Sequence, residues 1–450
     1  MPGPEPDRVG NSPELPRHAD VVVIGGGIAG VCTALELSER GLSVALCEKG
    51  HIAGEQSSRN WGWVRLTHRD VRELPLMAES RRLWAGMDAR IGGGTGYVQC
   101  GATYLCATEA ALELEREAIR ELAPHGVPAE LLSRAEVMAQ CPGLALDVVG
   151  ALHAPYDGRA EPQTAVPAMA RALLARGVGI HQDCAVRVVE TQAGRVSGVV
   201  TERGHIACSA VLVAGGVWSR LFLGNLGIEL PQLRTKGSVL RTEPVPDGPE
   251  GHLKYRDFAM RRRADGGYTV ASALPSRYQL TPDSLRLLRA FAPTLRAEWR
   301  NISLGVGPSF LEGLRTPRRW GPAEVSPFEK ARVLDPAPDD ARIDRALEVV
   351  RRAHPAFRHA KVAQKWGGYI DVLPDVVPVI SGTEGVKGGI PGLFVSTGFS
   401  GHGFGLGTGA GRLAADLITG AAPVVDLTPF RLHRFSDGTR ISPKGSVIQR

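Results

Sequence analysis

The chain has 450 residues, of which 43% are hydrophobic and 22% charged, and its formal net charge is +6. Such a length buries a large core and predicts two domains. The modest charge, with no basic stripe interleaved with aromatic residues, argues against nucleic-acid binding, and no apolar stretch is long enough to cross a bilayer. Seven cysteines without metal-type spacing indicate a reducing compartment, so we expect a cytoplasmic protein without a bound metal.

The chain opens with residues 1–18, which are rich in proline and charge and lack the apolar core of a signal peptide. We expect a mobile lead-in there. The first predicted strand, Val21–Ile24, then runs directly into a glycine-rich turn with the spacing G-x-G-x-x-G. An apolar helical pattern follows, and a second strand ends at an acidic residue, Glu48. This is the arrangement of a dinucleotide-binding βαβ unit.

Each position in this unit has a physical role. Gly25 permits the tight turn, Gly27 lets the backbone approach a pyrophosphate, and Gly30 lets helix and strand pack closely. The helix N-terminus supplies N–H groups and a positive dipole end, and the acid accepts hydrogen bonds from a ribose, which favours FAD or NAD over NADP. The cofactor-binding candidates here are Gly25, Gly27, Ile28, Ala29, Gly30, Glu48 and Lys49.

Further elements follow in chain order. Helical patterns cover 73–87, 109–122, 162–176, 282–300 and 339–352, and a hairpin pattern covers 186–200. Ala210–Ala214 is a continuous apolar run of the kind buried in a parallel sheet, whereas 233–333 alternates like antiparallel strands with one exposed face. The basic run Arg261–Arg263 is interpreted as a solvated turn or strand edge.

A second glycine cluster, Gly398–Gly407, again follows an apolar strand and precedes a helix. A helix N-terminus there suits a ligand group that becomes negative during reaction. The ring of a reduced flavin is such a group, and extended FAD requires a second cradle far along the chain, which NAD does not. This argument favours FAD.

At these residues the chain resembles the D-amino acid oxidase superfamily of flavin-dependent amino-acid and amine oxidoreductases. The resemblance covers about residues 19–434 and also rests on the loop 54–62, the segments 157–162 and 214–219, Trp366-Gly367-Gly368 and GFSGHGFG. It implies an α/β fold: a Rossmann-like FAD-binding domain with an inserted α+β substrate domain built on an antiparallel sheet. We expect the FAD-binding domain at 19–91, 145–232 and 362–435, the substrate domain at 92–144 and 233–361, and a flexible tail at 436–450.

The resemblance also implies the remaining cofactor contacts. The polar loop after the first unit lines the flavin side, a backbone position at the start of the hairpin meets the adenine, and the second glycine cluster meets the ring. Carried over by position, these contacts are Ser57, Ser58, Asn60, Trp61, Val186, Gly215, Trp218, Gly398, Ser400, Gly401, His402 and Gly403. Because no cysteine follows Cys208, a thioether to FAD from the C-terminal half is excluded and we expect non-covalent FAD.

The family implies hydride transfer from the carbon next to nitrogen to flavin N5, giving an imine that hydrolyses. The arginine by which relatives hold a substrate carboxylate is replaced here by Ile370, and Arg65 is the best substitute, with Arg69 a weaker one. An ion-pairing role of Arg65 away from substrate is an equal alternative. The catalytic candidates are Arg65, His402 and Tyr268, the last on a strand of the substrate domain.

Several alternatives stay open. The oxygen-activating lysine of relatives has no clear counterpart, so the electron acceptor is either dioxygen or another carrier. A flavin monooxygenase shares the first glycine motif, and an FAD-holding subunit of a multimeric dehydrogenase is a third interpretation. The sequence leaves the substrate, an amine or an amino acid, and the oligomeric state undetermined.

Overall fold

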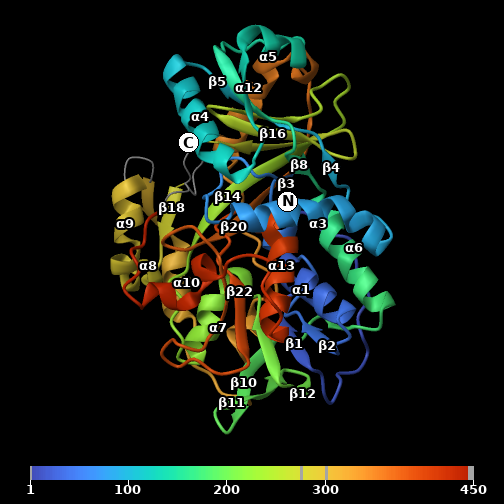
Figure 1. Cartoon of the computed structure of the whole chain (residues 1–450), viewed down its shortest axis with the longest axis vertical. Helices are drawn as coiled ribbons and strands as arrows, with labels where there is room; N and C mark the ends of the chain where they lie inside the picture. The colour runs from blue at the N-terminus through green and yellow to red at the C-terminus, as the bar shows by residue number, and fades with distance from the viewer. Residues whose placement is uncertain (1–2, 274–276, 299–302, 444–450) are drawn as a thin grey trace.

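Two large sheets organise the structure, one at each end of the molecule in Figure 1. The structure is a computed structural model, and it describes residues 3–273, 277–298 and 303–443. The first sheet has six strands, all parallel to their neighbours except for the antiparallel edge pair β21–β22. In spatial order they are β21 (Val379–Gly382), β22 (Leu393–Thr397), β13 (Ala210–Val213), β1 (Val21–Ile24), β2 (Val44–Cys47) and β9 (Gly179–His181).

Helices cover one face of this sheet and a small antiparallel sheet covers the other. Val21 and Val23 of β1 point to the helical side, and Val22 points to the small sheet, as strand alternation requires. The helices are α1 (Ile28–Glu39), α3 (Leu74–Ile91), α6 (Pro162–Ala175) and α13 (Gly403–Thr419). The small sheet contains β10 (Val186–Gln192), β11 (Arg195–Thr201) and β12 (Gly204–Ala207).

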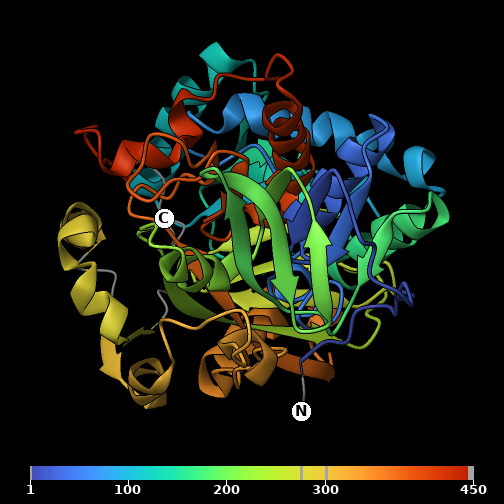
Figure 2. The same cartoon turned by 90° about the horizontal axis from the view of Figure 1, so that it is seen from below.

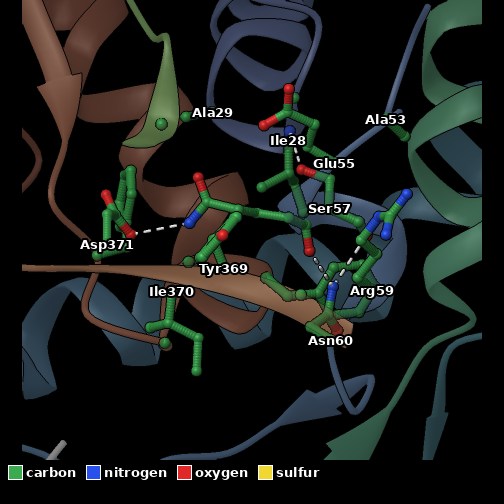
Figure 3. Close-up of a pocket in the computed structure, with 18 of the residues that line it drawn as sticks. Ile28, Ala29, Ala53, Glu55, Ser57, Arg59, Asn60, Tyr369, Ile370 and Asp371 are labelled. Carbon is green, nitrogen blue, oxygen red and sulfur yellow. Dashed lines mark hydrogen bonds between the residues drawn. The ribbon is translucent and has the colours of Figure 1, made fainter. Parts of the chain in front are cut away.

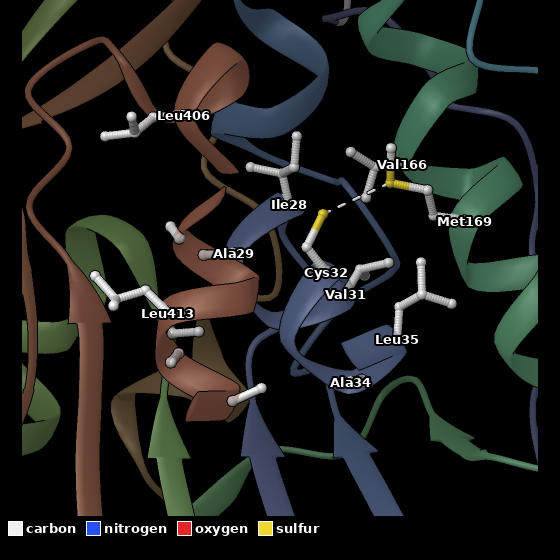
Figure 4. Close-up of a cluster of buried hydrophobic side chains, with 14 of the residues drawn as sticks. Ile28, Ala29, Val31, Cys32, Ala34, Leu35, Val166, Met169, Leu406 and Leu413 are labelled. Carbon is white, nitrogen blue, oxygen red and sulfur yellow. Dashed lines mark hydrogen bonds between the residues drawn. The ribbon is translucent and has the colours of Figure 1, made fainter. Parts of the chain in front are cut away.

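Helix α1 is the centre of the helical layer. Figure 4 shows its Cys32 facing Met169 of α6, with the two sulfur atoms 3.7 Å apart, and Leu413 of α13 on another side. All three side chains are buried in one cluster. The N-terminal unit and the C-terminal helix of the chain therefore share a core.

The second sheet has eight strands. Its neighbours are antiparallel except β5 and β15, which run parallel. In spatial order they are β20 (Val362–Val372), β14 (Leu233–Thr242), β17 (Tyr268–Ser272), β16 (Phe258–Arg262), β15 (His252–Tyr255), β5 (Ala102–Cys106), β7 (Gly150–Ala154) and β6 (Glu130–Ser133). The associated helices are α4 (Glu109–Leu122), α5 (Arg134–Gln140) and α12 (Asp340–Ala353). The predicted fold class is confirmed, with one parallel pair in the second sheet.

The sheets differ from the predicted segments in two places. Strands β7 and β20 lie within segments predicted for the FAD-binding domain, but both pair into the eight-stranded sheet. β20 pairs with β14 along almost its whole length, from Val362 to Val372. Hydrogen bonding to a distant partner decides the membership of these strands, and that partner cannot be read from local sequence. The other domain boundaries stay a prediction.

Short elements connect the sheets and extend from them. The helix predicted over 282–300 is divided at Leu287, and with a two-stranded sheet it forms a unit that projects at one side in Figure 2. These elements are α8 (Pro282–Arg286), α9 (Leu288–Glu298), β18 (Arg277–Leu280), β19 (Ser303–Val306) and α10 (Pro308–Arg315). The connecting elements are α2 (Gln56–Arg59), β3 (Trp63–Val64), β4 (Val98–Gln99), β8 (Gly158–Arg159), α7 (Ser219–Asn225) and α11 (Pro327–Lys330).

The N-terminal segment is packed, which corrects the predicted mobile lead-in. The Gly3 N–H donates to the Asp335 carboxylate, and the Ser12 N–H donates to the Ile180 carbonyl 2.7 Å away. Backbone hydrogen bonds to a sheet strand hold this segment even though its composition is polar. Of the predicted tail, 444–450 lies outside the described residues. Over the described part of the chain, no helix is both long and apolar enough to span a membrane.

Candidate cofactor and substrate site

A cavity of about 520 Å³ extends from the first glycine turn to the second. It is lined by the N-termini of α1 and α13, the loop 53–63 and edges of β14 and β20. Seventeen of the predicted site residues line it: Gly25, Gly27, Ile28, Ala29, Glu48, Lys49, Ser57, Asn60, Trp61, Arg65, Val186, Gly215, Trp218, Ser400, Gly401, His402 and Gly403. The structure therefore brings together residues from both ends of the chain.

The turn between β1 and α1 has the geometry that its glycines predict. Gly25 has φ +113°, in the region that favours glycine. Gly30 does not line the cavity, but a Cβ built on it would lie 2.0 Å from the Gly25 carbonyl oxygen. The Ile28 N–H donates to Ser57 Oγ at 2.9 Å, as Figure 3 shows. Gly27, the residue before α1, provides no side-chain cap, and it lines the cavity together with Ile28 and Ala29 of the first helical turn.

The acidic residue after β2 is held by backbone donors. Glu48 accepts from the Gly26 N–H at 2.6 Å and from the Gly50 N–H at 2.8 Å. Burial raises the pKa of Glu48 against the opposing effects of Lys49 and these N–H groups. Next to it, Lys49 Nζ lies 2.6 Å from Glu55 Oε1 and 4.7 Å from the centre of the Trp218 ring. Near the end of β2 the cavity is thus lined by charged side chains and by the Trp218 ring.

The polar loop after the first unit is fixed by its own side chains. Asn60 donates to the Ser57 carbonyl at 2.9 Å (Figure 3), and Gln56 donates to Asp371 at 3.0 Å. Ser58 is fully buried and its hydroxyl donates to the Glu55 carbonyl, so it shapes the loop without lining the cavity.

Asp371 connects this loop to the second glycine turn. It also accepts from Gln232 at 3.0 Å and from the Gly398 N–H at 2.8 Å. Burial raises the pKa of Asp371, while the hydrogen bonds to its carboxylate lower it. Gly398 is thus bound to Asp371 and does not line the cavity, whereas the next residues, Ser400 to Gly403, do.

Helix α13 directs its N-terminus at the cavity. His402 is the residue before the helix and makes no side-chain cap. The unsatisfied N–H groups and positive dipole end of such a helix stabilise negative charge that develops on a ligand.

Two buried arginines, Arg65 and Arg69, line the cavity near the N-terminus of α13. Arg65 and Arg69 are 2% and 9% exposed. Arg65 donates to the Tyr104 hydroxyl at 3.2 Å, and Arg69 donates through Nε to the Arg65 carbonyl at 3.3 Å, while Arg69 Nη1 is buried without a hydrogen-bond partner. Among the described residues, neither guanidinium has a carboxylate within 4.0 Å. A buried unpaired charge is costly, so this wall favours an anionic ligand group.

Tyr268 lies elsewhere. Its side chain is fully buried, its hydroxyl donates to the Pro249 carbonyl at 3.0 Å, and its ring packs on Phe357 with centroids 4.7 Å apart. It does not line the cavity, and we remove it from the catalytic candidates. The inward face of β17 that carries it is occupied by packing against α12.

The basic run 261–263 is a second correction. Arg261 is fully buried and forms a two-pronged ion pair with Glu161, at 2.8 and 3.0 Å, and its Nε donates to the Trp61 carbonyl. It is therefore not on a solvated turn. Phe258 and Met260 of β16 pack on the α12 side of the sheet. The alternate residue Arg261 therefore faces the other side, toward the loop that contains Trp61.

Sequence reasoning missed a group of polar lining residues. They come from the start of α2 and the residue before it, from β14, β18 and β20, and from α12 and the segment before it. They are Glu55, Gln56, Lys236, Ser238, Gln279, Asp339, Arg342, Tyr369 and Asp371. Glu55 and Gln56 lie in the loop 54–62 on which the resemblance rests but were not singled out there. No local pattern marks the others, because the pairing of distant strands brings β14 and β20 to the cavity. Ile370, at the position of the relatives' arginine, also lines it.

These features fit FAD. The cavity reaches both glycine turns, a helix N-terminus lies at each, and the backbone of Gly25 and Gly27 lines it without side chains. Non-covalent attachment stays a prediction. Across the described ranges, no group of three or more His, Cys, Asp or Glu side chains is arranged to hold a metal.

Comparison with known proteins supports the same conclusion. The L-amino acid deaminase of Proteus vulgaris superposes with a TM-score of 0.90 at 34% identity, over 95% of this chain and 100% of that one. The L-amino acid deaminase of Proteus myxofaciens, in complex with anthranilate, gives 0.89 at 33% identity over 97% of each. The sarcosine oxidase subunit beta of Rhizobium meliloti (strain 1021) is 26% identical over 97% of this chain and 93% of its own length. A family model described as DAO, FAD dependent oxidoreductase, matches residues 20–417, so the chain belongs to this family of enzymes and its cofactor is FAD.

Proposed function

We propose that this enzyme oxidises the C–N bond of an amino acid whose carboxylate is held by Arg65 and Arg69. The observation that carries the proposal is the pair of buried guanidiniums on the cavity wall without a carboxylate partner among the described residues. FAD held between the two glycine turns would supply the hydride acceptor for this oxidation, and hydrolysis of the oxidised substrate would then complete the reaction.

The contacts of the two arginines favour this role over an ion pair within the protein. Arg65 is held in place by the Tyr104 hydroxyl and lies 5.6 Å from the centre of the Trp63 ring. Burial lowers the pKa of Arg69 to about 10, so it still carries its charge at neutral pH. A carboxylate bound by charge-assisted hydrogen bonds would orient the substrate, and orientation supplies much of the rate.

The similar structure from P. myxofaciens supports an acidic substrate, because its ligand, anthranilate, combines a carboxylate with an amine. The sequence prediction of Arg65 as the carboxylate-binding residue stands as part of this proposal. Arg69, the weaker candidate, joins it because it lines the same wall.

The proposal is tested by anaerobic reduction of the enzyme-bound flavin. Each member of a panel of L- and D-amino acids is compared with the amine that lacks its carboxylate, for example phenylalanine with phenethylamine. We expect bleaching by amino acids and none by the matched amines. Equal bleaching by the amines would overturn the carboxylate assignment, and the rate of recolouring in air distinguishes dioxygen from another electron carrier.

A second candidate function is an FAD-holding subunit of a larger enzyme. It is favoured by the similarity to sarcosine oxidase subunit beta over nearly the full length of both chains. In that case the isolated chain would be bleached by dithionite but by no substrate in the panel. Co-purification from the native host would then identify a partner chain.

A further inference from the structure

A buried carboxyl group lies beside the histidine of the second glycine turn. Glu73 precedes α3 and its side chain is 0% exposed. Its Oε2 lies 3.3 Å from Nδ1 of His402, which lines the cavity. Among the described residues, Glu73 Oε1, Glu73 Oε2 and His402 Nδ1 have no partner with hydrogen-bond geometry, and the 3.3 Å contact between Oε2 and Nδ1 is the close approach between them. A small rotation of either side chain would turn this contact into a hydrogen bond and satisfy both groups.

The charged groups around this pair come from several elements. Arg69, Asp70, Arg72 and Asp375 act on Glu73, and Arg65 and Arg69 act on His402. Asp70 and Asp375 are themselves paired with Arg72, with nearest distances of 2.7 and 3.7 Å. Neither acid is thus available to hold a positively charged His402.

Burial determines the protonation of both partners. It raises the pKa of Glu73 to about 8, against the lowering effect of Arg69. Burial and then the two arginines lower the pKa of His402 well below its ordinary value. At neutral pH the pair therefore consists of a carboxylic acid and a neutral imidazole, not of two ions.

We infer that Glu73 is a positioning residue that donates its proton to Nδ1 of His402 and thereby fixes the tautomer that carries a proton on Nε2. The imidazole has its second nitrogen on the opposite edge from Nδ1, and the ring lines the cavity at the N-terminus of α13. His402 thus offers an N–H donor beside the helix end where negative charge is stabilised.

The arrangement has a consequence at higher pH. Once Glu73 loses its proton, the carboxylate accepts from Nδ1–H, and Nε2 presents a lone pair. The same ring then changes from donor to acceptor without moving. The catalytic consequence rests on the proposed function, but the tautomer does not, because it is defined in the absence of substrate.

The test is a pH titration of the holoenzyme labelled with ¹⁵N-histidine, monitored by the side-chain nitrogen resonances. The chain has 12 histidines, and a His402→Gln variant assigns the resonance of interest. We expect Nε2–H at neutral pH and a change to Nδ1–H with a midpoint near the value of about 8 for Glu73. A tautomer that stays constant from about pH 6 to about pH 9.5 would overturn the inference, and so would Nδ1–H at neutral pH.

The variant Glu73→Gln supplies the matched comparison, because an amide has the same shape and does not titrate. We expect its tautomer to be independent of pH, and its kcat/KM relative to wild type to rise above about pH 8. Glu79→Gln, on the next turns of the same helix and paired with Arg82, should behave like wild type. A transition that persists unchanged in Glu73→Gln contradicts the inference. If the substrate proposal fails, only the kcat/KM comparison is lost.

Discussion

The two ends of the cavity are built on different physical principles. At the first glycine turn, close packing of glycines and hydrogen bonds from backbone N–H groups to Glu48 and Ser57 fix the geometry. At the other end, the buried ionisable side chains of Arg65, Arg69 and Glu73 meet His402 from a distant part of the chain. The first end needs only the phosphate groups of the cofactor. The second end contains the guanidiniums of Arg65 and Arg69, whose charge a ligand carboxylate would balance. Substitutions should therefore separate cofactor retention from substrate binding.

The largest effect is expected at the arginine wall. Arg65→Met or Arg69→Met should lower kcat/KM for a carboxylate substrate by about 10²- to 10³-fold, because losing one partner of a buried charge pair costs about 2–5 kcal/mol. The flavin absorbance per protein should not change. Arg82→Met, an arginine on α3 with a side chain 66% exposed, is the control and should leave both unchanged. If Arg65→Met lost FAD, it would contradict the view that the two ends of the cavity act independently.

A smaller but global effect is expected at the ion pair between Arg261 of the second sheet and Glu161, the residue before α6. Glu161→Gln leaves buried Arg261 without a charged partner and should lower the free energy of unfolding by about 3 kcal/mol.

The pH dependence of the free energy of unfolding shows whether loss of the ion pair is what destabilises Glu161→Gln. Burial by itself raises the pKa of Glu161, but Arg261, Arg263 and the Ala264 N–H together bring it below the ordinary value. The folded pKa is thus lower than the unfolded one, so the pair stabilises the fold above about pH 4.5 and loses this effect as the pH falls further. Thermal unfolding should show the difference between wild type and variant shrinking in acid; a difference independent of pH would assign it to packing.

The smallest effects come from two helical glycines. Gly30→Ala places a methyl group 2.0 Å from the Gly25 carbonyl and should cost about 1–3 kcal/mol of stability and weaken FAD retention. Gly86→Ala on α3 meets no atom within 4 Å and should stabilise the protein by about 0.5–1 kcal/mol. Chemical denaturation and flavin release measure both. Equal behaviour of the two variants would show that the first turn does not depend on close packing.

Much of the fold can be predicted from local sequence patterns. The strand, turn and helix of the first unit are confirmed, and α4 has the predicted bounds Glu109–Leu122, because propensity, capping by Thr108 and apolar spacing all agree there. Membership of β7 and β20 in the second sheet is not readable, since it depends on pairing with distant strands.

The site divides in the same way. Glycine motifs led to the residues of the first turn, but Glu73 and Arg261 lie in charged stretches whose composition is typical of solvated surface. Their burial follows from partners far away in the chain, His402 and Glu161. Tyr268 failed as a candidate for a related reason: alternation on β17 defines two faces, and only the position of α12 shows which of them is core.

The shared core of α1 and α13 has a consequence for biosynthesis. The first glycine turn leaves the ribosome long before the helix that packs on α1 and follows the second glycine turn, residues 403–419, has been made. Until then the buried face of α1 is uncovered and the sheet lacks β22. A ribosome that stalls before this point releases a chain with an exposed apolar layer and half a cofactor cradle, which marks it for chaperones and proteases.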